Sequence, residues 1–296
     1  MNIQVIDAEA TYRCLLSEGD AAQREAIYCE TIIAPFEGLM KVFGGGNDSL
    51  TQFAQWGMSI DLFGDERRAS TDALVETLAA HDAWEQFAQA TRDAQTAFAP
   101  YAERIPLDSI NAALLVGDLS MNPLDRGYTG FGGMPGYVMT IYSKADDYTL
   151  PRLKGTTVHE LHHNVRSVVA PINFMQVTLA YYMIMEGLAE SFAAELYGEE
   201  VVGYYVTDFN EAELEQAKRV IGGALNVTGF NAVRGYIFGD ALAGTWGFEK
   251  AGVPNFAGYG IGYRVVQAHL KRTGKTVAET TFLSAEEIIT ESGYFE

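Results

Sequence analysis

The first hundred residues of the chain have the pattern of successive helices. Helix-like segments at 12–30 and 31–43 are separated by polar breaks. The segment "HDAWEQFAQATRDAQTAFAPYAERIP" offers Asp82 as a candidate N-cap, Glu85 three residues later as its partner in a capping box, and Pro100 as a stop. We therefore predict a helical N-terminal region.

The pattern changes near residue 107, where short apolar runs of strand length appear. Two of them, "SINAALLVGDLS" at 109–120 and "GYVMTIYS" at 136–143, predict strands. The segment between them, "DRGYTGFGGMPG" at 125–136, is rich in glycine but does not have the spacing of a dinucleotide-binding loop. We interpret it as a flexible loop that leads into an edge strand at 136–142.

From Pro151 onward the pattern is helical again. Pro151 suits a first helical turn, and the helix is expected to run to about Ala170, before Pro171. A second helix is predicted from Phe174 to a C-cap at Gly198. Later helices are expected at 208–225, 234–247 and 261–271, and from Ser284, where Glu287 completes a capping box.

These elements predict an α+β fold that is predominantly helical and contains a small mixed sheet. The change of pattern divides the chain into an N-terminal helical region, 1–104, and a second domain, 105–296. The chain has 296 residues, of which 48% are hydrophobic and 20% charged, so it can bury a substantial core.

Charge and targeting signals narrow the class of function. The formal net charge of -19 disfavours a phosphate-binding surface, so we expect no nucleic-acid partner. The N-terminus lacks the pattern of a secretory signal, and no apolar stretch reaches membrane-spanning length. We therefore expect a cytoplasmic protein without a membrane partner, in which Cys14 and Cys29 are reduced core residues.

The stretch "TVHELHHNVR" at 157–166 holds three of the five histidines. His159 and His163 frame an H-E-x-x-H motif, and residues four apart lie on one face of a helix, so two imidazoles can converge on a zinc ion at about 2.0–2.1 Å. Glu160 lies about 100° around the helix from His159. It is thus placed to take a proton from water whose pKa zinc has lowered toward about 7.

The alternative is a solvent-facing helix with incidental histidines. His162 lies on a different face from the pair and is expected at the surface or behind the ligands. His81 and His269 have no evident partners in the sequence, and we interpret both as structural.

A catalytic zinc ion needs a third protein ligand. Glu186 and Glu190 lie four apart in "MEGLAESFAAE", on a helix built mostly from apolar residues, and buried carboxylates need a partner. We predict Glu186 as the third ligand and Glu190 as the acceptor of an N–H bond from a ligand histidine, with His159 the first choice. Gly187 would let the two helices approach closely. The alternative is a half-exposed helix with two surface carboxylates.

"HELHH" followed by "EGLAE" resembles the gluzincin metallopeptidases, in which a glutamate on the next helix completes H-E-x-x-H. With the later "AGYGIGYRVVQAHL", the chain is similar to the bacterial YjaZ-type family of predicted zinc-dependent proteases over roughly residues 105–273. This resemblance implies a zincin-like catalytic domain with an active-site helix and one zinc ion per chain. It assigns His159, His163 and Glu186 as ligands and Glu160 as the general base.

The same resemblance implies a tyrosine that stabilises the oxyanion of the reaction. Tyr259 is the first candidate and Tyr263 the second, although the segment equally fits a helix start whose glycines relieve packing. The strand at 136–142 would be the edge strand that pairs with an extended substrate. Glycines at 130, 132, 133 and 136 would make its rim mobile.

The sequence therefore predicts a zinc metallopeptidase that cleaves peptides or partly unfolded proteins. Two other functions are compatible with the same residues. One is a zinc hydrolase of a non-peptide amide, and the other is a binding or regulatory protein that keeps the fold without turnover. Whether the N-terminal helices cover the cleft, and which oligomer forms, stay open at this level.

Overall fold

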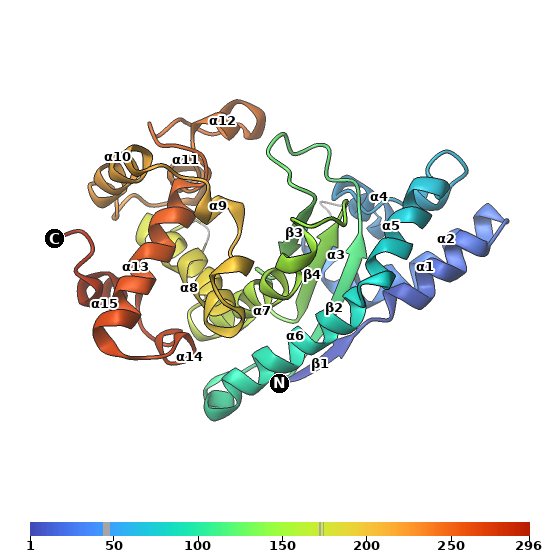
Figure 1. The fold of residues 1–296 in the computed structure, drawn as a ribbon, viewed down its shortest axis with the longest axis horizontal. Coiled ribbons are helices and arrows are strands. Elements are labelled where there is room, and N and C mark those ends of the chain that lie inside the picture. Colours follow the sequence, from blue (N-terminus) through green and yellow to red (C-terminus); the bar gives the residue numbers. More distant parts are fainter. Residues whose placement is uncertain (44–47, 172, 174) are drawn as a thin grey trace. The chain divides into compact units, whose positions relative to one another are not determined.

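The computed structural model describes residues 1–43, 48–171, 173 and 175–296. It is predominantly helical with a four-stranded mixed sheet, an α+β fold as expected (Figure 1). Contacts group the chain into two compact units, Met1–Thr96 with Pro106–Asn164, and Ala97–Ile105 with Val165–Glu296. The boundaries of these units differ from the domain boundary expected between residues 104 and 105. The expected domain division stays a prediction.

The first unit contains the sheet and the N-terminal helices. Its strands are β1 (Asn2–Val5), β2 (Ser109–Val116), β3 (Tyr128–Phe131) and β4 (Tyr137–Tyr142). Its helices are α1 (Ala8–Ser17), α2 (Ala21–Tyr28), α3 (Glu37–Phe43), α4 (Ser49–Gln55) and α5 (Arg68–Ala80), together with most of α6 (Ala83–Phe98) and α7 (Leu153–Val169).

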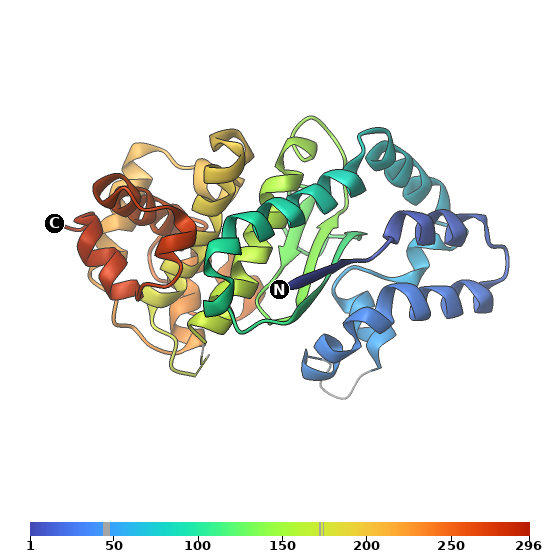
Figure 2. The same cartoon turned by 90° about the horizontal axis from the view of Figure 1, so that it is seen from below.

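The strands lie in the order β1-β2-β4-β3. β1 and β4 both run parallel to β2, and β3 pairs with β4 in antiparallel orientation, with Gly130 opposite Thr140. β1, the dark blue arrow in Figure 2, was not predicted, because a four-residue strand inside a helical region has little pattern of its own. The prediction that 136–142 is an edge strand is wrong, since β4 is paired on both sides.

Successive residues of β4 point to opposite faces of the sheet and meet different partners. Tyr137 packs on Phe36, in the turn before α3, with ring centroids 6.2 Å apart. Thr140, which points the other way, has its hydroxyl 3.4 Å from that of Thr157 in α7. The segment around Phe36 and the histidine helix therefore cover opposite faces of β4.

The second unit is built around two long helices, α8 and α13. Its helices are α8 (Leu179–Tyr197), α9 (Tyr204–Thr207), α10 (Glu211–Gly222), α11 (Phe230–Phe238), α12 (Asp240–Trp246), α13 (Ala257–Thr273), α14 (Val277–Thr280) and α15 (Ala285–Ser292). α8 and α13 cross closely, because Gly187 of α8 lies against the backbone of Gly262 and Tyr263 in α13. Figure 1 shows α15 beside α13.

Several helix ends follow their predicted signals. α8 has Thr178 as its N-cap and ends at Gly198, which adopts φ +93°, and Ser284 and Glu287 form the predicted capping box. The predicted start of α8 at Phe174 lies outside the described residues. The helix predicted at 234–247 is two helices, since Gly239 interrupts it with φ +82°.

α6 begins at Ala83, directly after Asp82, but Asp82 adopts φ +51° rather than the extended conformation typical of an N-cap, so its capping role stays a prediction. The prediction that both cysteines are core residues is wrong. Cys14 is exposed and Cys29 half-buried, so neither belongs to the core, although both are free thiols as expected. No helix in the described parts of the chain is long and apolar enough to cross a membrane.

Candidate metal centre

The histidine motif lies on a helix that is buried on every side. α7 follows a short 3-10 turn that holds Pro151, and its residues from 155 to 166 are all buried. His159, Glu160 and His163 are each less than one-tenth exposed. The prediction that His162 could be a surface residue is wrong, because it is fully buried. The alternative of a solvent-facing helix therefore does not apply.

The two framing histidines point their rings at one place. Their Nε2 atoms lie 3.0 Å apart, and the rings meet edge to face with centroids 4.6 Å apart. Nitrogens that bind one tetrahedral zinc ion at 2.0–2.1 Å lie roughly 3.3 Å from each other. The pair therefore has nearly the separation that a shared ion requires.

Glu160 lies against β3, the edge strand of the sheet. Gly130 of β3 is so close that a Cβ atom added to it would overlap the carboxylate of Glu160. A Cβ atom on Gly132 would overlap the backbone carbonyl of the same residue. The two glycines thus let β3 approach α7 at the carboxylate, which is a different role from the mobility expected of them.

Glu186 joins the histidines in one group. Candidate ligand atoms of His159, His163 and Glu186, all buried, lie within 4.8 Å of one another. Two imidazole nitrogens and one carboxylate oxygen are a donor set that suits zinc and leaves a coordination position open. The residues present therefore fit the ion that the sequence predicts.

Glu190 lies one turn beyond Glu186 on α8 and is also buried. Its Oε2 accepts a hydrogen bond of 3.1 Å from the backbone N–H of Gly203, which precedes α9. This bond holds the carboxylate in a defined orientation. The expected bond from His159 to Glu190 stays a prediction.

A family model described as "Predicted Zn-dependent protease (DUF2268)" matches residues 83–290. The chain belongs to this family of predicted zinc-dependent proteases. The matched segment includes the whole of α7, α8 and α13, and so all the predicted ligands.

A relative from Bacillus subtilis (strain 168), "Uncharacterized protein YjfC", is 40% identical over 192 residues. The match covers 65% of this chain and 64% of the relative, so the chain spans somewhat less than two thirds of that protein's length. No solved structure matches the chain. These comparisons place the chain in the protease family and say nothing of its substrate.

The two candidate tyrosines of this predicted protease have different surroundings. The hydroxyl of Tyr263 donates a 2.6 Å hydrogen bond to Oε2 of Glu199. Burial, and then this hydrogen bond, raise the pKa of Tyr263 far above its usual value, so the phenol keeps its proton. The ring of Tyr259 is half-buried and packs on Tyr205, with centroids 5.0 Å apart. Neither role in catalysis is decided by these contacts.

Packing explains the glycines of "AGYGIGY" directly. A Cβ atom on Gly258 would overlap Ile237, one on Gly260 would overlap Phe209, and one on Gly262 would overlap the carbonyl of Met183. The interpretation of this segment as a helix start with glycine-relieved packing is therefore supported. Gly187 serves the same crossing of α8 with α13, and not an approach to the histidine helix as expected.

Sequence reasoning missed one polar residue of this region. Asn164 follows His163 directly and is fully buried. Its side-chain amide forms hydrogen bonds with the segment that connects β3 to β4. It lies four residues after Glu160, so the same spacing argument that pairs the histidines would have placed it on the face of Glu160.

Proposed function

We propose that this chain hydrolyses peptide bonds as a zinc-dependent peptidase of the gluzincin type. The observation that carries the proposal is the buried group of His159, His163 and Glu186, whose candidate ligand atoms lie within 4.8 Å of one another. In this proposal the three residues hold one zinc ion, and Glu190 orients a ligand histidine. The bound ion supplies Lewis-acid polarisation of the substrate carbonyl and activation of water.

Glu160 acts as the general base in the proposed reaction. It takes a proton from the attacking water as the oxygen bonds to the carbonyl carbon. When the C–N bond breaks, the same carboxyl group returns the proton to the departing amine. Its position on the turn between the histidines, against Gly130, supports this assignment. Tyr259 is our first choice to stabilise the oxyanion and Tyr263 the second.

β3 replaces 136–142 as the proposed substrate-pairing strand. It is an edge strand of the sheet, and its Gly130 lies against the carboxylate of Glu160. A peptide that added to this edge would pair through its backbone, with little dependence on its side chains. We therefore propose extended peptides or unfolded segments as substrates.

Metal content tests the ligand group first. Wild-type protein purified without chelator should contain about one zinc ion per chain by mass spectrometry, and Glu186→Ala should lose most of it. Glu195→Ala is a matched control on the same helix, since Glu195 accepts a bond from the Val277 N–H and is not in the ligand group. If the wild type holds no zinc and takes none up, the proposal is wrong.

A peptide library then tests the reaction. Glu160→Gln should bind zinc like the wild type but lose roughly 10²–10⁴-fold in the rate of hydrolysis, the contribution typical of a positioned general base. Glu160-dependent hydrolysis of simple amides without peptide cleavage would instead identify the non-peptide hydrolase. Zinc binding without any Glu160-dependent turnover would identify a binding protein.

A further inference from the structure

Asn164 is a buried amide whose hydrogen-bonding groups are almost all used on one segment. The side chain is 0% exposed. Its Nδ2 donates to the carbonyl oxygens of Gly132, at 2.7 Å, and Tyr137, at 2.8 Å. Its Oδ1 accepts a 2.7 Å bond from the backbone N–H of Gly136. Both amide hydrogens and one oxygen lone pair thus hold the connection between β3 and β4.

This connection is built to be held at both ends. Gly136 adopts φ +90°, which favours glycine, and its N–H points at Asn164. Gly132, at the other end, lies against the backbone carbonyl of Glu160. Asparagine is seldom fully buried, and here the burial is explained by the three bonds.

The face of α7 that carries Asn164 is also the face of Glu160. These residues are four apart, as are His159 and His163 one position earlier, so the helix presents two adjacent pairs. The first pair brings its ring nitrogens together, and the second contacts the strand edge through Gly130, Gly132 and Gly136. Asn164 therefore sets how β3 lies along the helix at the carboxylate.

We propose that Asn164 is a positioning residue for the reaction. It fixes the β3–β4 connection on α7, so that Gly130 confines the carboxylate of Glu160 and the edge of β3 keeps its register with that carboxylate. This proposal rests on the proposed function in one respect, the role of Glu160 as general base. The hydrogen bonds themselves do not depend on it.

Asn164→Ala is the main test, with Asn111→Ala as the matched control. Asn111 of β2 makes a comparable amide-to-carbonyl bond, to Pro35 at 2.6 Å, in the same unit. We expect Asn164→Ala to keep its zinc and lose about 10- to 100-fold in kcat, with a smaller change in KM, because a misplaced catalytic group acts on the chemical step. Asn111→Ala should stay within about threefold of the wild type.

Hydrogen exchange supplies a readout that needs no activity. In Asn164→Ala the amide of Gly136 should lose its protection, since its acceptor is gone, while amides of β2 keep theirs. In Asn164→Asp the acceptor remains but both donors are lost. Gly136 should then stay protected while kcat still falls.

The outcomes separate the two proposals. Unchanged exchange at Gly136 in Asn164→Ala, or a kcat equal to that of the Asn111→Ala control, would overturn the positioning role. Loss of zinc from Asn164→Ala would also overturn it, because the residue would then act on the ligands. A wild type without zinc-dependent hydrolysis contradicts the proposed function instead, and the exchange result then still decides whether Asn164 holds the connection. If Asn164→Ala does not fold, Asn164→Asp and Gly132→Ala, which pushes the same segment from α7, replace it.

Discussion

Tyr259 and Tyr263 lie one turn apart on α13 and make different contacts. The Tyr263 hydroxyl donates to Glu199, whereas Tyr259 packs its ring on Tyr205 and Phe256. We predict that Tyr259→Phe lowers kcat about 10²–10³-fold, as expected for the loss of an oxyanion donor, with zinc content unchanged. Tyr263→Phe should mainly cost stability, about 1 kcal/mol for one hydrogen bond. Steady-state kinetics and thermal melts of both variants decide, and the reverse pattern would assign the role to Tyr263.

The sequence indicated the candidate metal-binding residues, but it did not indicate the residues that hold the neighbouring segments in place. Two histidines four residues apart lie on one face of a helix, so the approach of their ring nitrogens followed from the spacing alone. Asn164 carries no such signal, because an asparagine in a helix is ordinary at a surface. Its role depends on the three backbone groups that it meets, and these come from residues 27 to 32 positions away in the sequence.

At the scale of elements, the crossing of α8 and α13 depends on glycine. A Cβ atom on Gly262 would overlap the carbonyl of Met183, one turn before Glu186 on α8. We predict that Gly262→Ala destabilises the protein by about 1–3 kcal/mol, as overpacking does. Gly244 in α12 has open space at its Cβ position, so Gly244→Ala should instead stabilise it by about 0.5–1 kcal/mol. Denaturant unfolding of both variants measures the change in the free energy of unfolding. Equal changes in the two variants would show that helix propensity, and not packing at the crossing, determines the effect.

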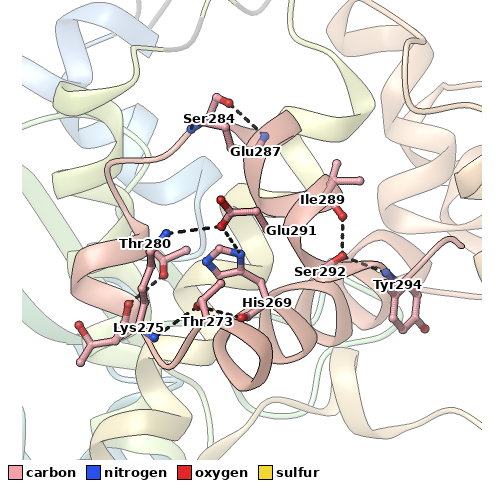
Figure 3. Close-up of polar contacts among 11 residues, drawn as sticks. His269, Thr273, Lys275, Thr280, Ser284, Glu287, Ile289, Glu291, Ser292 and Tyr294 are labelled. Carbon is pink, nitrogen blue, oxygen red and sulfur yellow. Dashed lines mark hydrogen bonds and ion pairs between the residues drawn. The ribbon is translucent and has the colours of Figure 1, made fainter.

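A second element-scale prediction concerns the junction of α13 with α15. His269 is 0% exposed and lies 3.4 Å from Oε2 of Glu291, which also faces Lys275 (Figure 3). Burial lowers the pKa of His269, against the opposing effect of Glu291. The unfolded chain therefore takes up a proton more readily below about pH 6.5, and the free energy of unfolding falls as the pH drops from there toward the lowered pKa.

Unfolding at pH 7.5 and at pH 5.5 tests this junction. His269→Gln should lose less stability than the wild type between these two values, because it has no proton to take up. An identical pH dependence in His269→Gln would mean that other groups cause it.

Helices and strands could be predicted where a local sequence signal marks them, but the sequence did not show which strands lie next to each other in the sheet. Pro151 predicted the start of α7, and a capping box predicted the start of α15; both are local sequence signals. The spatial order β1-β2-β4-β3 puts the later strand β4 inside the sheet, and nothing within 136–142 distinguishes an inner strand from an edge strand. β3 was not predicted because Gly130 and the glycines after it resemble a loop, whereas contact with the carboxylate of Glu160 explains the glycine at 130.

At the scale of the whole molecule, metal and folding should be linked. A zinc ion that binds only the folded chain stabilises it by about 2.7 kcal/mol at a hundredfold excess over Kd, which corresponds to a melting temperature about 5 °C higher. We predict that a chelator lowers the melting temperature of the wild type by about this amount and that added zinc restores it.

His163→Ala and Glu186→Ala should melt at nearly the same temperature with and without zinc, because each lacks a proposed ligand. Glu160→Gln should keep the full zinc-dependent shift, since the base is not a ligand. If Glu160→Gln loses the zinc-dependent shift and Glu186→Ala keeps it, then Glu160 is the zinc ligand and Glu186 is not. If neither chelator nor zinc changes the melting temperature of the wild type, the protein does not use the metal.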